Sequence, residues 1–291
     1  MHIAEAYRTF IDDRRINGLA DSTLAFYEDT VGKFAHFCHD SQLEEASREI
    51  NPYLLSLKNR GLAQNSLHAH WRGIRAFWIF AFEEGFIDHK ARLPKIKEEK
   101  KHVKPLSLSQ IRQVLRSFDM SNFSTLRNQT IIHLMFDTGI RLSEVAKILI
   151  PDLDLMQQWI LIKGKGEKDR WVPFSDSAKR QLWIYLKQRS KYATDGEDTL
   201  FIQQNGTQFK SRGIQIMFRR LAEKMSFGGI RLSPHTIRHS FALNWIEGGG
   251  DPFSLQKILG HSSQTKTSRY VAMAKSTIKA QHNRYSPAER I

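Results

Sequence analysis

The most informative stretch of this chain, residues 235–270, reads HTIRHSFALNWIEGGGDPFSLQKILGHSSQTKTSRY. It ends at Tyr270, which comes after His235, Arg238 and His261. A tyrosine phenol has a pKa near ~10 and is a weak nucleophile at neutral pH. It becomes effective when its target carries concentrated negative charge and fixed cationic donors stabilise the transition state. This stretch therefore contains a nucleophile and most of the donors needed to attack a phosphodiester.

Two helices are predicted here, because a capping residue precedes a proline at 233–234 and again at 251–252. Proline is favoured at the first helical position, where its missing N–H costs no hydrogen bond. On the first of these helices His235 and Arg238 lie three residues apart, close to the positive N-terminus. Both side chains can therefore face one phosphate group.

The other histidines of this region have different expected roles. His261 follows a Leu-Gly pair at a helix end, where the turn directs the imidazole outward. His239 is expected to pack or to hydrogen-bond internally. A zinc site is not expected, because carboxylate and thiolate partners are missing at ligand spacing. Tyr285 is the alternative tyrosine, but it lies far beyond the histidines in a polar tail.

A second cationic group lies upstream. Arg141 follows a glycine at a tight connection between two predicted helices, and Glu144 lies three residues later on the same helical face. The carboxylate can hold the guanidinium in one orientation, and a pre-aligned arginine binds two phosphate oxygens at once. On this segment alone, an ordinary surface ion pair worth about 0.3–0.5 kcal/mol is the better explanation.

Lys165 lies in a turn, with a glycine on either side of it. Glycine lets the backbone approach a ligand closely, and a mobile ammonium there can reach a DNA groove and protonate a departing oxygen. Lys163 and Lys168 are alternatives for that role, and a lysine-rich turn is usually only solvated.

The whole chain is predicted to be mainly α-helical, with a small antiparallel β-sheet. Two β-prone runs, 159–163 and 170–173, flank a glycine-rich centre and predict a hairpin. A further short strand is predicted at 199–203. Apolar periodicity and capping residues predict helices at 3–17, 22–38, about 47–59, 64–83, 107–118, 126–137, 142–150, 175–190 and 211–225.

Composition restricts the kind of partner. The net charge of the 291 residues is +14, and residues 106–291 alone carry 28 basic and 15 acidic side chains. Such a balance is typical of a protein that binds a polyanion, although charge alone does not separate DNA from RNA, an anionic membrane or a solvated surface. A single cysteine, Cys38, excludes an intramolecular disulfide. Neither a membrane-spanning run nor a signal-peptide pattern is found, which predicts a cytoplasmic, nucleoid-associated protein.

Three regions are expected along the chain. Residues 1–92 form an N-terminal helical domain, and 93–105, charged and bounded by prolines, form a linker. Residues 106–291 form a second domain. The expected DNA-contacting residues are one face of the fourth helix, two linker lysines and one arginine of the second domain: His68, Arg72, Arg75, Lys100, Lys101 and Arg212.

Several motifs together resemble the signature of the tyrosine recombinase, or phage integrase, family. They occur in the order and at the separations of that family, and the resemblance covers the whole chain. Size and motif wording resemble the short Xer-type and mobile-element recombinases. The motifs are Asp137-Thr-Gly-Ile-Arg141-Leu-Ser-Glu144, Gly164-Lys165-Gly166, His235-Thr-Ile-Arg238-His239, Leu259-Gly260-His261 and Tyr270.

This resemblance implies a SAM-like, four-helix core-binding domain followed by a catalytic domain. It also implies that Tyr270 attacks the scissile phosphate, which forms a 3′-phosphotyrosyl bond and frees a 5′-hydroxyl. Arg141 and Arg238 are then the residues that hold the non-bridging oxygens, with His261 as a further donor.

Three more roles are implied in the same way. His235 takes the phenolic proton, Lys165 is the general acid to the 5′-oxygen, and Glu144 orients Arg141. Exchange of one phosphodiester for another conserves its energy, so neither ATP nor a metal is expected as a cofactor. The chain also lacks a P-loop, and its motif regions hold no Asp/Glu cluster.

The implied partner is double-stranded DNA with an inverted-repeat core site. The family works as a tetramer on two DNA sites, through a Holliday junction, in some cases with a second recombinase or accessory protein. The tail 274–291 is then expected to pack on a neighbouring subunit. Two alternatives are a type IB topoisomerase-like enzyme and a DNA-binding module without catalysis.

Overall fold

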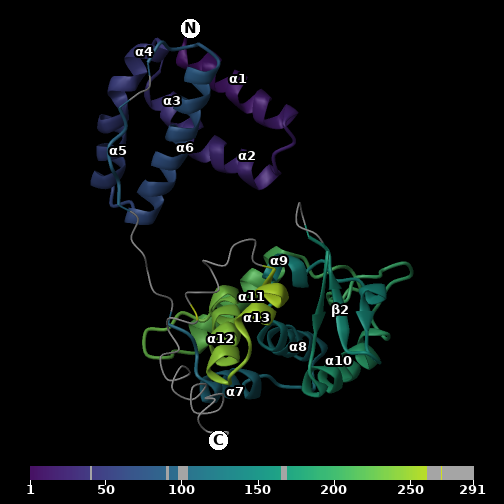
Figure 1. The fold of residues 1–291 in the computed structure, drawn as a ribbon. Helices are drawn as coiled ribbons and strands as arrows, with labels where there is room; N and C mark the ends of the chain where they lie inside the picture. Colours follow the sequence, from purple (N-terminus) through teal and green to yellow (C-terminus); the bar gives the residue numbers. More distant parts are fainter. Residues whose placement is uncertain (40, 90–91, 98–103, 165–168, 261–269, 271–291) are drawn as a thin grey trace, which may run out of the picture. The chain divides into compact units, whose positions relative to one another are not determined.

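Two separate units make up the chain in the computed structural model. They are Met1–Lys101 and His102–Ile291, and Figure 1 draws both in sequence colours. The boundary falls inside the predicted linker 93–105, whose described residues 93–97 and 104–105 form neither helix nor strand. The structure describes residues 1–39, 41–89, 92–97, 104–164, 169–260 and 270.

The first unit is built of helices. Its elements are α1 (Ile3–Ile16), α2 (Asp21–Tyr27), the π-helical turn η1 (Glu28–Gly32), α3 (Lys33–Phe37), α4 (Leu43–Ala46), the 3-10 turn η2 (Ser47–Glu49), α5 (Ile50–Asn59) and α6 (Gln64–Glu83). The predicted helices at 3–17 and 64–83 are confirmed. The segment predicted as 22–38 is helical but contains the π turn, and short helical pieces at 43–49 precede α5.

Helix α6 supplies the centre of the first core. Ile74 and Phe77 on this helix are fully buried. The rings of Phe34 and Trp78 meet edge to face with centroids 5.7 Å apart, and those of Phe10 and Phe77 do so at 5.6 Å. Edge-to-face contact is a favoured aromatic geometry that adds to the gain from burial. The apolar periodicity that predicted this helix is confirmed at Ile74 and Trp78, which are both buried.

The second unit packs helices against a small sheet. Its elements are α7 (Leu108–Arg116), α8 (Phe123–Thr138), α9 (Leu142–Val145), the 3-10 turn η3 (Ile150–Asp152), β1 (Leu153–Asp154), β2 (Trp159–Ile162), β3 (Arg170–Pro173), α10 (Asp176–Arg189), α11 (Ser211–Lys224), α12 (Pro234–Glu247) and α13 (Pro252–Leu259). Helix α8 lies in the middle of this unit and packs on both α10 and α12 (Figure 1). In the part of the chain that is described, no helix is long and apolar enough to cross a membrane.

The helix predicted at 142–150 begins at Leu142 as expected, but its predicted length is wrong, because α9 ends at Val145. Beyond it the backbone turns away to pair with a distant segment. The N–H of Leu200 donates to the carbonyl of Ile148 at 2.8 Å, and Leu149 forms an isolated β-bridge with Thr199. These long-range hydrogen bonds outweigh the local helical pattern. The strand predicted at 199–203 is likewise only a pair of isolated bridges.

The three strands form one antiparallel sheet in the order β1-β2-β3. The predicted hairpin is confirmed, with Ile160 opposite Val172 and Ile162 opposite Arg170. Ile160 and Val172 are fully buried, so this face of the sheet covers the core. The two-residue strand β1 was not predicted.

Both predicted proline-containing helix starts are confirmed. The Ser233 side chain accepts a hydrogen bond from the N–H of Thr236 at the start of α12. Asp251 does the same for the N–H of Ser254 at the start of α13. Such caps satisfy N–H groups that have no partner inside the helix. They define where α12 and α13 begin, and these two helices carry much of the site described next.

Candidate active site

One carboxylate holds both the main chain and the side chain of Arg141. The backbone N–H of Arg141 donates to Oε2 of Glu144 at 2.7 Å, and its Nη1 donates to Oε1 at 2.8 Å. The Glu144 side chain is only 10% exposed, whereas that of Arg141 is 33% exposed, so the carboxylate end of the pair is the one shielded from solvent. The structure thus places Glu144 where the sequence suggested that it could orient Arg141.

Arg238 is buried, with 8% of its surface exposed, and it binds two main-chain oxygens. Its Nη1 donates to the carbonyl of Gly139 at 2.7 Å and its Nη2 to that of Leu259 at 2.8 Å. Gly139 has φ +64 and ends α8, and a Cβ there would overlap the side chains of Phe241 and Leu259. Only glycine adopts this conformation readily in so tight a space. The turn before Arg141 therefore also supplies an acceptor for Arg238.

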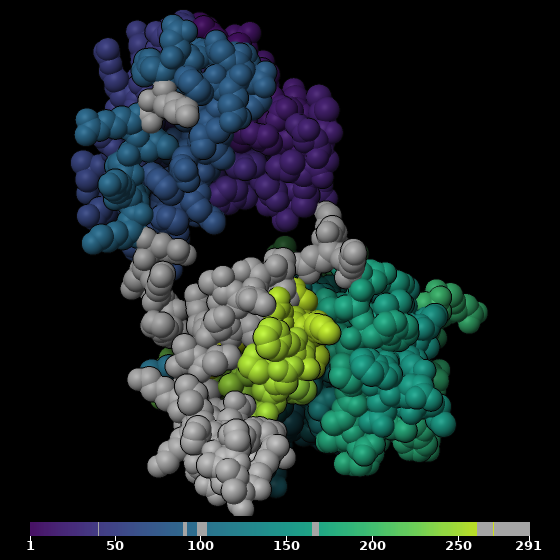
Figure 2. All heavy atoms as spheres, viewed as in Figure 1, coloured from purple at the N-terminus to yellow at the C-terminus, as the bar shows by residue number. Residues whose placement is uncertain are grey.

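The C-terminal end of α13 holds three arginines. Successive carbonyls of Ile258, Leu259 and Gly260 accept hydrogen bonds, in that order, from Arg170, Arg238 and Arg141. The last carbonyls of a helix lack intrahelical partners and carry the negative end of its dipole. The helix end is therefore a natural acceptor for guanidinium groups. In Figure 2 α13, drawn in yellow, reaches the surface of its unit beside the teal segment that contains β3.

Tyr270 is buried, with 5% of its surface exposed, and its hydroxyl lies 2.7 Å from Nδ1 of His239. The two rings are tilted against each other with centroids 5.4 Å apart. The expectation that His239 hydrogen-bonds internally is confirmed, and its partner is the tyrosine itself. His235, one helical turn earlier on α12, is exposed. Lys165 and His261 lie outside the described residues.

The electrostatic field of the site is positive. Burial and the neighbouring Arg141 lower the pKa of Arg238 to about 10, while Glu144 and Tyr270 act in the opposite direction. Burial raises the pKa of the Glu144 carboxyl, but hydrogen bonds from Arg170 and Arg141 outweigh it, and the pKa lies below its ordinary value. At neutral pH the site thus holds three guanidinium charges around one carboxylate. This surplus of positive charge attracts an anion such as phosphate.

Residues 106–277 of the chain match the family model described as the phage integrase family. The chain belongs to this family. The tyrosine recombinase XerC of Bacillus subtilis is 28% identical over 277 residues, which cover 91% of this chain and 90% of that protein. XerC of Listeria monocytogenes (strain HCC23) is also 28% identical, with 91% and 92% covered.

Solved structures of two integrases have the same fold. The Tn1549 transposon integrase in complex with transposon right end DNA superposes with a TM-score of 0.82 at 21% identity, covering 98% of this chain and 100% of that one. A lambda integrase dimer bound to a core site has a TM-score of 0.77 at 18% identity, with 93% and 95% covered. The predicted fold class, mainly helical with a small antiparallel sheet, is confirmed.

One member of the arginine cluster, Arg170, was missed in the sequence. It begins β3, two residues before the buried Val172, so the two side chains start on the same, core-facing side of the sheet. An arginine at such a position needs an anionic or carbonyl partner inside the protein. That strand periodicity was the signal that could have identified it.

The candidate DNA residues of the first unit lie on α6, where Arg72 and Arg75 are exposed. The Arg72 guanidinium lies 5.5 Å from the ring centre of Phe26, and that of Arg75 lies 5.7 Å from the ring of Trp71. His68 stacks on the same Trp71 ring, with centroids 5.2 Å apart. The structure brings these three side chains onto one aromatic-backed face. The linker lysines, Lys100 and Lys101, lie outside the described residues.

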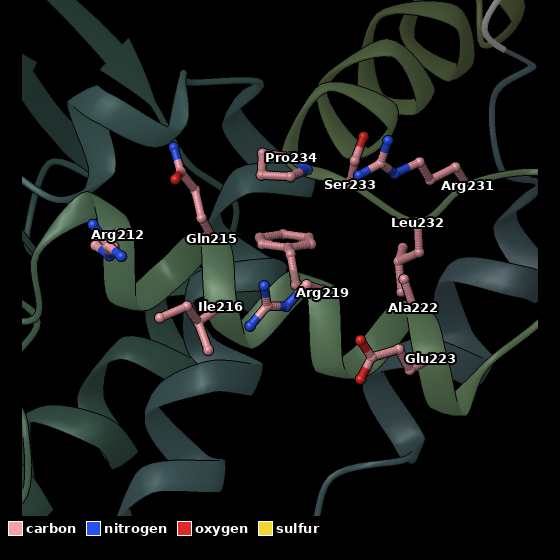
Figure 3. A pocket seen from close by; sticks show the side chains of 11 residues that line it. Arg212, Gln215, Ile216, Arg219, Ala222, Glu223, Arg231, Leu232, Ser233 and Pro234 are labelled. Carbon is pink, nitrogen blue, oxygen red and sulfur yellow. The ribbon is translucent and has the colours of Figure 1, made fainter. Parts of the chain in front are cut away.

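Arg212 is exposed on α11 and lines a cavity of about 670 Å³ in the second unit. Figure 3 shows it with Gln215 and Arg219 along the same helix, and with Arg231 beside the start of α12. Sequence reasoning identified only Arg212 in this group. The spacing of 212, 215 and 219 places their side chains on one helical face, and this was the signal that could have found the others.

Proposed function

We propose that this chain is a site-specific DNA recombinase that cleaves and rejoins strands through a covalent bond between Tyr270 and a 3′-phosphate. The observation that carries the proposal is the cluster of Arg141 and Arg238 on the end of α13, close to the buried Tyr270. A protein that only bound DNA would have no use for a tyrosine at such a position. The family membership of residues 106–277 supports the same reaction class.

The two guanidinium groups bind the non-bridging oxygens of the scissile phosphate. The recorded bonds of Arg238 to carbonyl oxygens use two of its five N–H donors, so the group retains donors for phosphate oxygens. Burial and the nearby Arg141 disfavour its charge, and an incoming phosphate relieves that cost. Charge that develops on phosphorus-bound oxygens in the transition state is stabilised in the same way.

In the reaction, the oxygen of Tyr270 attacks phosphorus while the bond from phosphorus to the 5′-oxygen breaks. The phenolic proton passes to His235, and the 5′-oxygen receives a proton from Lys165. Rejoining runs this sequence in reverse with the 5′-hydroxyl of a different strand. The bond energy is conserved, so no ATP is consumed.

His239 has a separate part in this scheme. Its Nδ1 lies 2.7 Å from the Tyr270 hydroxyl, and this contact holds the phenol next to α12. His235 lies one turn earlier on the same face of the helix, where its side chain is exposed and accessible to DNA. Thus one histidine positions the nucleophile and the other takes its proton.

The proposed partner is double-stranded DNA with an inverted-repeat core site, bound by four copies of the chain on two sites. Arg72 and Arg75 on the first unit and Arg212 on the second are exposed cations, as such contacts require. The tail 274–291, proposed to pack on a neighbouring subunit, lies outside the described residues. We place the protein with the nucleoid, in the cytoplasm.

The test uses the wild-type protein and the Tyr270→Phe variant on nicked suicide substrates drawn from DNA around its own gene, without magnesium. Wild-type protein is expected to become linked to a 3′ DNA end, seen as a retarded band on a denaturing gel. Tyr270→Phe is expected to bind the same DNA and form no adduct. An adduct that persists in Tyr270→Phe contradicts the choice of nucleophile.

Two other outcomes separate the alternatives. Relaxation of supercoiled plasmid without a specific site and without strand exchange favours a topoisomerase-like enzyme over a recombinase. Tight DNA binding by wild-type protein with no adduct on any DNA points to a binding module without catalysis.

A further inference from the structure

Arg170 is committed to partners within the protein. Its side chain is 12% exposed, and three of its donors have recorded acceptors. Nη1 and Nη2 form a two-pronged ion pair with the Glu144 carboxylate, at 3.1 and 2.9 Å, while Nε donates to the carbonyl of Ile258 at 2.9 Å. The planar guanidinium provides these donors in fixed directions, which the ammonium of a lysine does not. Arg170 thus connects β3, α9 and α13.

Glu144 receives four hydrogen bonds from two arginines, two on each oxygen. Oε1 accepts from the Nη1 groups of Arg141 and Arg170, and Oε2 accepts from the Arg141 backbone N–H and from Arg170 Nη2. With both oxygens occupied from two directions, the carboxylate has one orientation. Without Arg170 only the two hydrogen bonds from Arg141 hold the carboxylate, and Arg141 then has a less firmly fixed partner.

The contact with α13 acts on the second phosphate-binding arginine as well. Arg170 binds the carbonyl of Ile258, and the next two carbonyls bind Arg238 and Arg141. Gly260 lies directly against the Arg170 guanidinium, since a Cβ there would stand 3.0 Å from three of its atoms. The position of the helix end therefore depends on Arg170.

From these contacts we propose that Arg170 is a positioning residue for strand cleavage. Through Glu144 and the last turn of α13, it sets the directions in which Arg141 and Arg238 present their guanidinium groups to one phosphate. This inference rests on the proposed function. All three guanidinium nitrogens of Arg170 already donate to Glu144 or Ile258, so we assign this residue a positioning role and not a phosphate contact.

The test compares Arg170→Met and Arg170→Lys with wild type in single-turnover cleavage of the suicide substrate, at saturating protein. A displacement of about 1 Å in a reacting group costs about 10²-fold in rate. We expect Arg170→Met to cleave about 10- to 100-fold more slowly, with a DNA dissociation constant within about twofold of wild type. Arg170→Lys is expected to recover little of the rate, because lysine cannot make the two-pronged pair.

Two matched variants separate positioning from loss of charge. Arg180→Met removes an exposed arginine of α10 and is expected to cleave like wild type. Glu144→Gln keeps a side chain of the same size but breaks the ion pair. If Arg170 acts through Glu144, the double variant Glu144→Gln/Arg170→Met cleaves about as slowly as the slower single variant. If the two single losses of rate multiply in the double variant, Arg170 does not act through Glu144, and that part of the inference is overturned.

A readout that needs no catalysis uses the Arg141 backbone N–H, whose partner is Glu144 Oε2. Its hydrogen exchange is expected to speed up by at least about tenfold in Arg170→Met, while amides in the middle of α8 exchange at wild-type rates. Unchanged exchange at Arg141 overturns the inference, whatever the activity. Should Arg170→Met fail to fold, the same two measurements on Arg170→Lys decide.

Failure of the proposed function has a different signature from failure of this inference. If wild-type protein forms no Tyr270-dependent adduct, the proposed reaction is wrong, and the proposed role of Arg170 in cleavage is wrong as well. If wild type forms the adduct and Arg170→Met cleaves at the same rate, the recombinase assignment stands and only the positioning role is wrong.

Discussion

At the scale of single residues, Arg238 is a buried cation whose recorded hydrogen bonds both end on main-chain oxygens. In Arg238→Lys the positive charge remains, but one ammonium cannot reach both carbonyls and a phosphate. We expect cleavage to fall about 10²–10³-fold, the usual cost of losing one transition-state donor. Single-turnover cleavage measures it, with DNA binding as the control. A cleavage rate of Arg238→Lys within about threefold of wild type would contradict the proposal that Arg238 binds phosphate oxygens with its guanidinium group.

The contact between Gly260 and Arg170 can be tested with a matched control, because Gly249 in the same unit also has a positive φ. Gly260 has φ +62 and lies against Arg170, whereas Gly249 has φ +84 with nothing near its missing Cβ. Alanine costs about 1–2 kcal/mol of backbone strain at either position. We expect Gly260→Ala to lose more free energy of unfolding than Gly249→Ala, and to cleave at least about tenfold more slowly. Equal loss of stability and rate in the two variants would show that the contact with Arg170 is unimportant.

The two histidines of α12 are expected to differ in their effect on the rate. His235→Gln removes the proposed proton acceptor, and general base catalysis contributes about 10²–10⁴-fold. His239→Gln keeps a side chain that hydrogen-bonds to the Tyr270 hydroxyl, so we expect a loss below about tenfold. Single-turnover cleavage across pH 6 to 9 compares the two. The reverse order would assign the proton transfer to His239.

The sequence indicated individual site residues better than it indicated their contacts. Arg141, Glu144 and Arg238 were expected as site residues from the family resemblance, and the structure places both arginines on the end of α13, with Glu144 bound to Arg141. Two features of the site could not be predicted from the sequence. The partners of Arg238 are main-chain carbonyls, which carry no sequence signal, and Arg170 acts across 26 residues of chain on Glu144. Pairings of this kind depend on the tertiary fold.

At the scale of elements, the cap of α13 makes stability depend on pH. Hydrogen bonds from Ser254 lower the pKa of Asp251 from its ordinary value of 3.8. A carboxylate with a lowered folded pKa stabilises the fold fully above the unfolded pKa, and this contribution is lost as pH falls through the folded pKa. We expect wild type to exceed Asp251→Asn in melting temperature above about pH 4, with the difference shrinking toward pH 2. A difference that is constant with pH would contradict the role of the charge.

Elements with strong local signals were predicted well, and elements made by long-range pairing were not. The caps at Ser233 and Asp251 and the hairpin of β2 and β3 follow from neighbouring residues. The segment 146–150 has a helical apolar pattern, but its backbone pairs with 198–200 instead. The strand β1 has two residues, too few for an alternating pattern to be recognised.

At the scale of the whole molecule, basic residues are concentrated after the linker, since 1–92 carry 11 basic and 13 acidic side chains. Binding to DNA is expected to weaken steeply with salt, because each phosphate contact releases a counterion. We expect Arg212→Gln to reduce the slope of log affinity against log salt by about one, and Arg72→Gln to do the same if α6 also contacts phosphates. The exposed Arg180 serves as the control. If the slope is unchanged in Arg212→Gln, Arg212 makes no contact with DNA phosphates.

The end of α13 also has a consequence for how this site tolerates mutation over evolutionary time. The acceptors for Arg170, Arg238 and Arg141 there are peptide oxygens, and every amino acid carries one. Replacing Ile258 or Leu259 alters packing but leaves the acceptor in place. Position 258 can therefore change among apolar residues without loss of the arginine cluster, whereas Leu259 also belongs to the family motif. The glycine at 260 lacks this latitude, since its backbone angle and the adjacent guanidinium both exclude a side chain.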